Sequence, residues 1–131
     1  IVNAGGDNIS PSRVEEKLNI EPEISQSMVY GDFKNYLVAI IVPDKEQALL
    51  WAKNNSKENS LSTLIKDEDY NKTIKEIISK VNNNLSVIEQ VRKFILIDHE
   101  FTIENDMMTP TMKVKRYKIK SVFGDQLENL Y

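Results

Sequence analysis

Apolar residues recur three and four positions apart in several stretches of the chain, which is the spacing of one face of an α-helix. The longest such face spans residues 70–88 and predicts a helix of roughly four turns with a turn near residues 82–84. A shorter face predicts a helix from Pro11 to about Asn19, with Ser10 as its capping residue. The residues of the longest face are Tyr70, Ile74, Ile77, Ile78, Val81, Leu85 and Ile88.

Two neighbouring segments have the patterns of paired β-strands. Residues 24–30 alternate between apolar and polar side chains, and we expect Ile24, Met28 and Tyr30 to share one side. Residues 36–42 are continuously apolar, which is typical of a strand that is buried on both faces. The short Gly-Asp-Phe-Lys-Asn segment between them predicts a hairpin.

The rest of the chain predicts further helices and a third strand. Asp44 can cap a helix that runs to about Lys53. Residues 91–97 predict a third strand, and residues 94–97 are too apolar for an exposed sheet edge. The resulting order predicts an α+β fold, with a small sheet of about three strands and helices packed on it. The apolar positions of the final helix are Ile119, Val122, Phe123, Leu127 and Leu130.

The composition narrows the class of protein. A chain of 131 residues with 40% hydrophobic and 28% charged residues suits one domain around a single core. The absence of cysteine excludes disulfides, thiolate nucleophiles and cysteine-bound zinc, and it favours a cytoplasmic protein. No apolar run approaches the roughly 20 residues that span a bilayer, and residues 1–20 lack the features of a signal peptide.

Charge is unevenly distributed along the chain. The net charge of −3 argues against general nucleic-acid binding, yet five cations fall within eight residues near the C-terminus. The first residue is not methionine, and we interpret residues 1–131 as part of a longer protein. The five cations are Lys113, Lys115, Arg116, Lys118 and Lys120.

Three features are candidates for chemistry. The lysine run after Pro110 can meet a phosphate, although taken alone it is more typical of a solvated helix surface. Gly5 and Gly6 precede a helix and permit a close backbone approach or a positive φ, but a plain turn explains them too. His99 is the only histidine, and without a second ligand at helical spacing we interpret it as an ordinary polar residue.

Three motifs stand out along the chain: Gly-Gly-Asp-Asn-Ile-Ser-Pro at 5–11, the hairpin at 28–44, and Thr-Pro-Thr-Met-Lys-Val-Lys-Arg at 109–116. In this order they resemble the C-terminal subdomain of adenylate-forming (AMP-binding) enzymes. The chain resembles this family over nearly its whole length, most closely the long-chain fatty acid-CoA ligases. Family members typically carry Pro-Lys-Thr-x-x-Gly-Lys in the last motif. The shifted proline and the missing glycine match the long-chain ligase variant.

The resemblance implies specific roles. The full-length enzyme would join a fatty acid to ATP with Mg²⁺, releasing pyrophosphate, and then transfer the acyl group to CoA. Lys113 would enter the active site of the enzyme's own N-terminal adenylation domain, where its ammonium offsets charge that develops on oxygen; Lys115 is the alternative. Gly5 and Gly6 would form a wall of the pantetheine tunnel. Asn8 would lie near CoA or the domain interface.

The resemblance also implies motion. The subdomain would swing between two poses about a hinge just before Ile1, presenting Lys113 in one pose and the glycine pair in the other. We therefore expect residues 1–131 to be inactive alone. The full-length enzyme is expected in the cytoplasm, with peripheral association with a membrane as an option.

The residues by themselves also allow a different class of function. The chain can be a non-catalytic interaction module whose basic C-terminal tail docks on a partner or on an anionic membrane surface. The sequence upstream of Ile1 would distinguish this alternative from a ligase.

Overall fold

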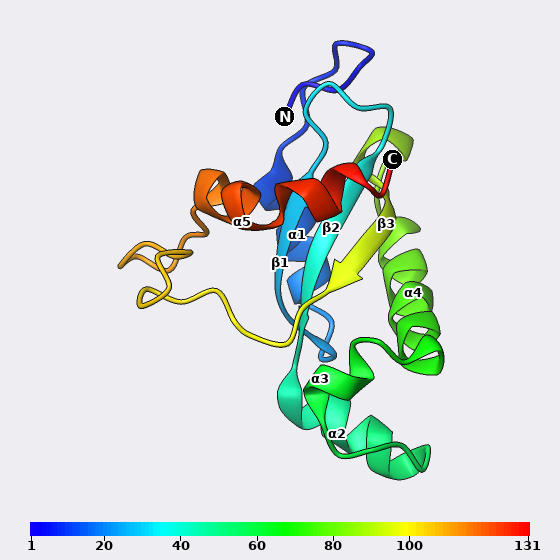
Figure 1. Cartoon of the computed structure of the whole chain (residues 1–131). Coiled ribbons are helices and arrows are strands. Elements are labelled where there is room, and N and C mark those ends of the chain that lie inside the picture. The colour runs from blue at the N-terminus through cyan, green and yellow to red at the C-terminus, as the bar shows by residue number, and fades with distance from the viewer.

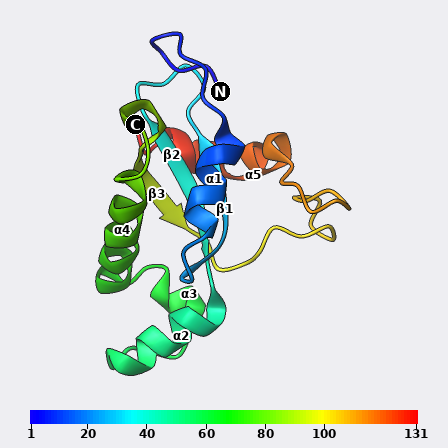
Figure 2. The ribbon, with the colours of Figure 1, turned by 180° about the vertical axis from the view of Figure 1, so that it is seen from behind.

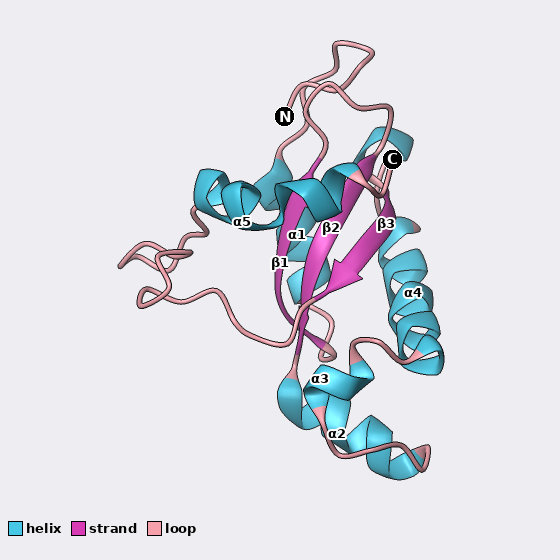
Figure 3. Cartoon of the chain, viewed as in Figure 1, coloured by secondary structure: helices cyan, strands magenta, loops and turns pink.

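The computed structural model describes residues 1–131 and shows a three-stranded sheet with helices on both faces (Figures 1 and 3). A long loop over residues 97–115 joins the last strand to the last helix. The helices are α1 (Pro11–Asn19), α2 (Lys45–Asn54), α3 (Leu61–Leu64), α4 (Glu68–Asn82), the 3₁₀-helix η1 (Val87–Glu89) and α5 (Arg116–Glu128), and the strands are β1 (Ile24–Tyr30), β2 (Leu37–Pro43) and β3 (Val91–Leu96).

The sheet has the order β1-β2-β3, with β2 in the centre. β1 and β2 form the expected antiparallel hairpin, and β3 returns parallel to β2 after α2, α3 and α4. All seven residues of β2 are buried, as its continuous apolar pattern predicted. The predicted α+β class is confirmed.

Apolar side chains form one cluster on each face of the sheet. The larger cluster packs α1 and α4 on one face, and the smaller packs α5 on the other (Figures 1 and 2). Alternate residues of β2 belong to the two clusters, since successive side chains of a strand point to opposite faces. The members of the larger cluster include Val14, Leu18, Ala39, Ile41, Ile74 and Ile78, and those of the smaller include Val38, Ile40, Ile119, Phe123 and Leu127.

Side-chain caps lie at the predicted starts of α1 and α2. The Ser10 hydroxyl accepts a hydrogen bond from Arg13 N–H at 3.3 Å, and the Asp44 carboxylate accepts from Gln47 N–H at 3.0 Å. Such caps satisfy backbone N–H groups that have no partner within the helix.

One prediction for β1 was wrong. Ile24 lies in the α1–α4 cluster, whereas Met28 lies in the α5 cluster. The cause is a shift of register between Ile24 and Gln26, where one extra residue in β1 reverses the side to which the strand's start points.

The prediction that residues 94–97 are too apolar for an exposed sheet edge did not exclude an edge position, because β3 is an edge strand. Its apolar residues are half-covered on the two faces instead. Phe94 and Leu96 pack against the α1–α4 cluster, and Ile95 packs against the α5 cluster. The apolar content of β3 therefore reports burial of its faces and not a central position.

Two apolar positions assigned to helical faces are exposed. Val122 in α5 is 50% exposed, and Ile88 in η1 is 40% exposed. α5 touches the sheet through a narrow stripe of Ile119, Phe123 and Leu127, which leaves Val122 on its flank.

Three tyrosine hydroxyls keep their protons to high pH. A hydrogen bond to the Glu128 carboxylate raises the pKa of Tyr30 to about 12, and burial raises the pKa of Tyr70 to about 12. Burial also raises the pKa of Tyr131. In the unfolded chain the pKa of tyrosine is about 10. The contribution of these protonated hydroxyls to the free energy of unfolding is therefore fully present below about pH 10 and is lost as the pH rises through about 12. We predict a smaller free energy of unfolding in urea at pH 11 than at pH 9.

Tyr70→Phe provides the control. The Tyr70 hydroxyl is buried without a hydrogen-bond partner, so its removal is expected to leave stability at pH 9 intact and to reduce the loss at pH 11. Equal stability of the original chain at the two pH values would contradict the prediction.

Candidate functional site

Lys113 lies in a braced hairpin between β3 and α5. Met108 and Val114 form an antiparallel bridge, and Lys115 N–H donates to the Met107 carbonyl at 2.8 Å. Thr109 holds both sides of Lys113: its N–H donates to the Lys113 carbonyl at 2.8 Å, and its hydroxyl accepts from Lys113 N–H at 3.1 Å. The backbone of Lys113 is therefore fixed while its side chain is exposed.

Met112, at the tip of this hairpin, adopts a left-handed conformation. Its φ is +64°, and its side chain is 66% exposed. A non-glycine residue with positive φ is uncommon and is held here by the hydrogen bond from Met112 N–H to the Thr109 carbonyl at 2.9 Å. The turn thus carries local strain directly beside Lys113.

The two candidate lysines have different surroundings. The Lys115 ammonium forms an ion pair with the Asp106 carboxylate, and this hydrogen bond holds the pKa of Asp106 below its ordinary value. Lys113 forms no ion pair. Of the two, only Lys113 presents an ammonium that is not already neutralised by a neighbouring acid.

Lys113 lines an open groove of about 450 Å³ between its hairpin and α1. Most of the residues that line the groove are polar or charged, and one wall is the face of α1 that carries Glu15. Nothing in it encloses an adenine ring or an acyl chain. The full lining consists of Ser12, Glu15, Glu16, Asn19, Ser27, Met112, Lys113, Val114 and Arg116.

The glycine pair lies at the tip of a second small hairpin, residues 2–8. Val2 and Asn8 form a bridge, and Asn3 N–H donates to the Asp7 carbonyl at 3.0 Å. Gly6 has a φ of +84°, whereas a Cβ at Gly5 would meet only the side chains of Asn3 and Asp7, at 3.5 and 3.6 Å. Gly6 is thus required by the backbone, and Gly5 is not required by local packing.

This glycine hairpin is anchored to the turn between β1 and β2. Ala4 N–H donates to the Lys34 carbonyl at 2.9 Å, and Phe33 N–H donates to the Val2 carbonyl at 2.8 Å. Its tip, with Gly5 and Gly6, and the adjoining Asn8 are exposed.

The structure does not bring the glycine pair and Lys113 together. The N-terminal hairpin extends from one end of the sheet, and the loop that carries Lys113 extends from a different side in both views (Figures 1 and 2). Each surface is open to the outside of this domain. A partner surface can therefore meet one of them without covering the other.

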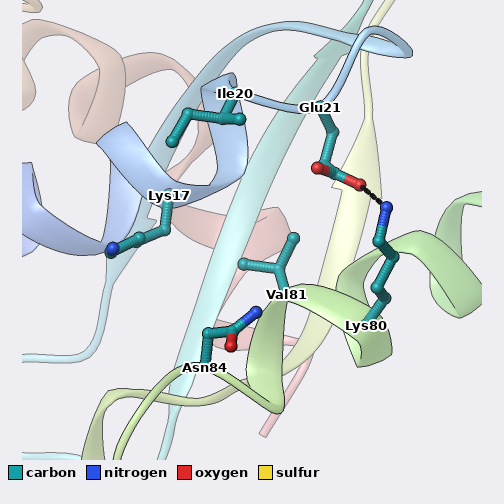
Figure 4. Close-up of a pocket in the computed structure, with 6 residues that line it drawn as sticks. All are labelled: Lys17, Ile20, Glu21, Lys80, Val81 and Asn84. Atoms are coloured by element: carbon teal, nitrogen blue, oxygen red, sulfur yellow. Dashed lines mark hydrogen bonds and ion pairs between the residues drawn. The ribbon is translucent and has the colours of Figure 1, made fainter.

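A further pocket, of about 340 Å³, lies between the C-terminal ends of α1 and α4 (Figure 4). Lys80 from α4 forms an ion pair with Glu21 at 3.0 Å across it, and this hydrogen bond raises the pKa of Lys80. The charge that faces this pocket is thus partly neutralised from within. Its lining is Lys17, Ile20, Glu21, Lys80, Val81 and Asn84.

His99 lies in the loop that follows β3, next to an acid and an aromatic ring. Its Nδ1 lies 3.3 Å from the Asp98 carboxylate, and its ring stacks on Phe123 with 6.0 Å between centroids. No cluster of three or more histidine, aspartate and glutamate residues in the chain is arranged to hold a metal ion.

Sequence reasoning missed Glu15, a buried acid on the inner face of α1. It lies one turn before Leu18 and next to Val14, at a helical position where an apolar residue is expected. That mismatch is the signal by which it can be found, because a buried carboxylate requires partners.

The chain belongs to the AMP-binding enzyme C-terminal domain family, because the model of that family matches residues 1–131. This confirms the resemblance that the three motifs indicated.

Among curated proteins, the chain is similar to long-chain-fatty-acid–CoA ligases. It is 37% identical to ligase FadD15 of Mycobacterium tuberculosis, covering 100% of this chain and 22% of that protein. It is 33% identical to long-chain-fatty-acid–CoA ligase 1 of Cavia porcellus, covering 98% of this chain and 19% of that protein. The chain thus spans about a fifth of the length of these relatives.

The fold also matches a solved adenylation domain. The A domain of a carboxylic acid reductase from Segniliparus rugosus, solved with AMP and a co-purified carboxylic acid, has a TM-score of 0.79 and 27% identity. The match covers 100% of this chain and 19% of that one. Separately, none of the helices described above has the length and apolarity of a membrane span.

Proposed function

We propose that residues 1–131 are the mobile C-terminal subdomain of a longer long-chain fatty acid-CoA ligase. The enzyme activates a fatty acid with ATP to an acyl-adenylate and then transfers the acyl group to CoA. The partner of this subdomain is the enzyme's own N-terminal adenylation domain. Mg²⁺ is proposed to act with ATP in the site of that domain.

The observation that carries the proposal is the unpaired ammonium of Lys113 on a braced hairpin, in a chain that aligns over its whole length with ligases. Carboxylate attack on ATP gathers negative charge on oxygens. A fixed cation that enters a closed site offsets this charge at little reorganisation cost. The test is Lys113→Ala in the full-length protein, with fatty acid-dependent exchange of pyrophosphate into ATP as the measurement.

The basic tail does not form a free cationic surface. Lys115 pairs with Asp106, Arg116 pairs with Glu15, and Lys120 lies 3.7 Å from Asp32. Three of the five clustered cations are therefore already engaged inside the domain, which disfavours docking of the tail on an anionic membrane.

The glycine hairpin is proposed to border the path of CoA, with Asn8 beside it. Gly6 is a poor test of this role, because its φ of +84° makes any larger side chain strained. Gly5→Leu adds volume without that strain. In the full-length protein it is expected to slow acyl-CoA formation from supplied acyl-adenylate by about tenfold, a barrier increase of about 1.4 kcal/mol, because its side chain obstructs the thiol. Pyrophosphate exchange is expected to be unchanged.

Gly5→Ala is the matched control, and its small side chain is expected to leave both half-reactions near their original rates. Equal losses in the two half-reactions for Gly5→Leu would show that Gly5 is an ordinary turn residue.

A further inference from the structure

Glu15 is a buried carboxylate with three hydrogen-bond donors. Its side chain is 9% exposed, and Oε2 accepts from Val29 N–H of β1 at 2.8 Å. Arg116 donates from Nη1 to Oε2 and from Nη2 to Oε1, at 2.5 Å each. This two-pronged arrangement is the strongest common geometry for an arginine and a carboxylate, and it joins residues that are 101 positions apart.

The Glu15–Arg116 pair lies at the start of α5. Arg116 is the first residue of α5, and Lys115 before it provides no side-chain cap. Cations at a helix N-terminus are disfavoured by the helix dipole, and α5 begins among Lys115, Arg116 and Lys118. The Glu15 carboxylate supplies the negative charge that this terminus lacks, so the pair holds the start of α5 against α1 and β1.

Lys113 lies only three residues before Arg116, one member of this pair. On its other side, the Thr109 hydrogen bonds hold its backbone within the hairpin. The hairpin itself is exposed at its tip and is joined to the sheet by loop residues. Met108 and Val114 also tie the base of the hairpin to the α5 cluster through apolar contacts. The Glu15–Arg116 pair is the ion pair that connects this segment to α1 and β1.

We propose that Glu15 and Arg116 are positioning residues that place Lys113 for adenylation. This inference rests on the proposed function of Lys113. Neither residue contacts substrate in this scheme; they fix the angle at which the hairpin leaves the domain, and so the point that the ammonium reaches inside the partner site. Misplacement of a catalytic group by about 1 Å is enough to cost on the order of 10²-fold in rate.

The experiment uses Arg116→Lys in the full-length protein. Lysine keeps the charge but loses the paired donors of the guanidinium. Pyrophosphate exchange is expected to fall by about tenfold to a hundredfold, while acyl-CoA formation from supplied acyl-adenylate stays within about twofold. The ratio of the two rates in one preparation is independent of the fraction of folded protein. Glu15→Gln, which still accepts from Val29 N–H, serves as the second variant and is expected to give the same split.

A double-mutant comparison separates positioning from other roles. If Arg116 acts through Lys113, then Arg116→Lys adds no further loss of exchange in a Lys113→Ala background. Arg13→Gln is the matched control. Arg13 lies in α1, as Glu15 does, but its ion pair is with Glu89 of η1 and not with α5. This substitution is expected to leave both half-reactions unchanged.

The outcomes are distinguishable. An equal loss from Arg116→Lys in both backgrounds, or an equal loss in both half-reactions, overturns the positioning role. A severe effect of Lys113→Ala with none from Arg116→Lys or Glu15→Gln also overturns it but leaves the proposed function intact. No effect of Lys113→Ala removes the proposed function and the positioning role together.

Discussion

Replacement of Lys113 by alanine in the full-length protein is expected to lower acyl-adenylate formation by about 10²-fold or more. The ammonium is unpaired within this domain and is free to meet the charge that develops on the carboxylate and the α-phosphate. That charge develops in only one of the two half-reactions. Acyl-CoA formation from supplied acyl-adenylate is therefore expected to survive the same substitution.

Lys115→Ala is the matched control two residues away. Its ammonium is engaged by Asp106, and exposed pairs of this kind contribute little, so both half-reactions are expected to stay near their original rates. Loss of adenylation from Lys115→Ala, with Lys113→Ala tolerated, would assign the catalytic role to Lys115. Tolerance of both substitutions would mean that the lysines form only a solvated surface.

A large loss of stability is expected from Ile119→Ala in α5. Ile119 is fully buried against the sheet, and truncation of a buried isoleucine costs about 2–5 kcal/mol because the cavity fills only in part. The measurement is urea unfolding of the 131-residue chain, with an unchanged denaturant slope as the sign that the folded state is retained.

Val122→Ala in the same helix is the control. Its side chain is 50% exposed, so the expected change is within about 0.5 kcal/mol. Equal destabilisation by the two substitutions would mean that α5 packs through a broader face than the structure shows.

Local patterns were enough to predict most of the elements. The helices over 11–19, 45–54 and 68–82 follow from apolar spacing and from caps such as Ser10 and Asp44, which act within a few residues. The β1–β2 hairpin follows from two strand patterns around a short turn. The very short helices α3 and η1 were not predicted individually, because four and three residues carry too little periodicity.

Contacts between distant residues set the limits of prediction. The extra residue in β1 that sends Ile24 to the other face shows only in the pairing with β2. The choice between Lys113 and Lys115 depends on Asp106, which approaches Lys115 only when the hairpin closes. No spacing rule connects residues that meet through the folding of a loop.

The sequence by itself determined the class of fold, the family and the two segments that carry the candidate site, because periodicity, turns and motifs are local properties of the chain. Only the tertiary structure decided which lysine is unpaired, which glycine has a positive φ and how Lys113 is connected to the domain. The last of these depends on Glu15 and Arg116, which lie 101 positions apart and come within hydrogen-bond distance only after α1 and α5 have packed around the sheet.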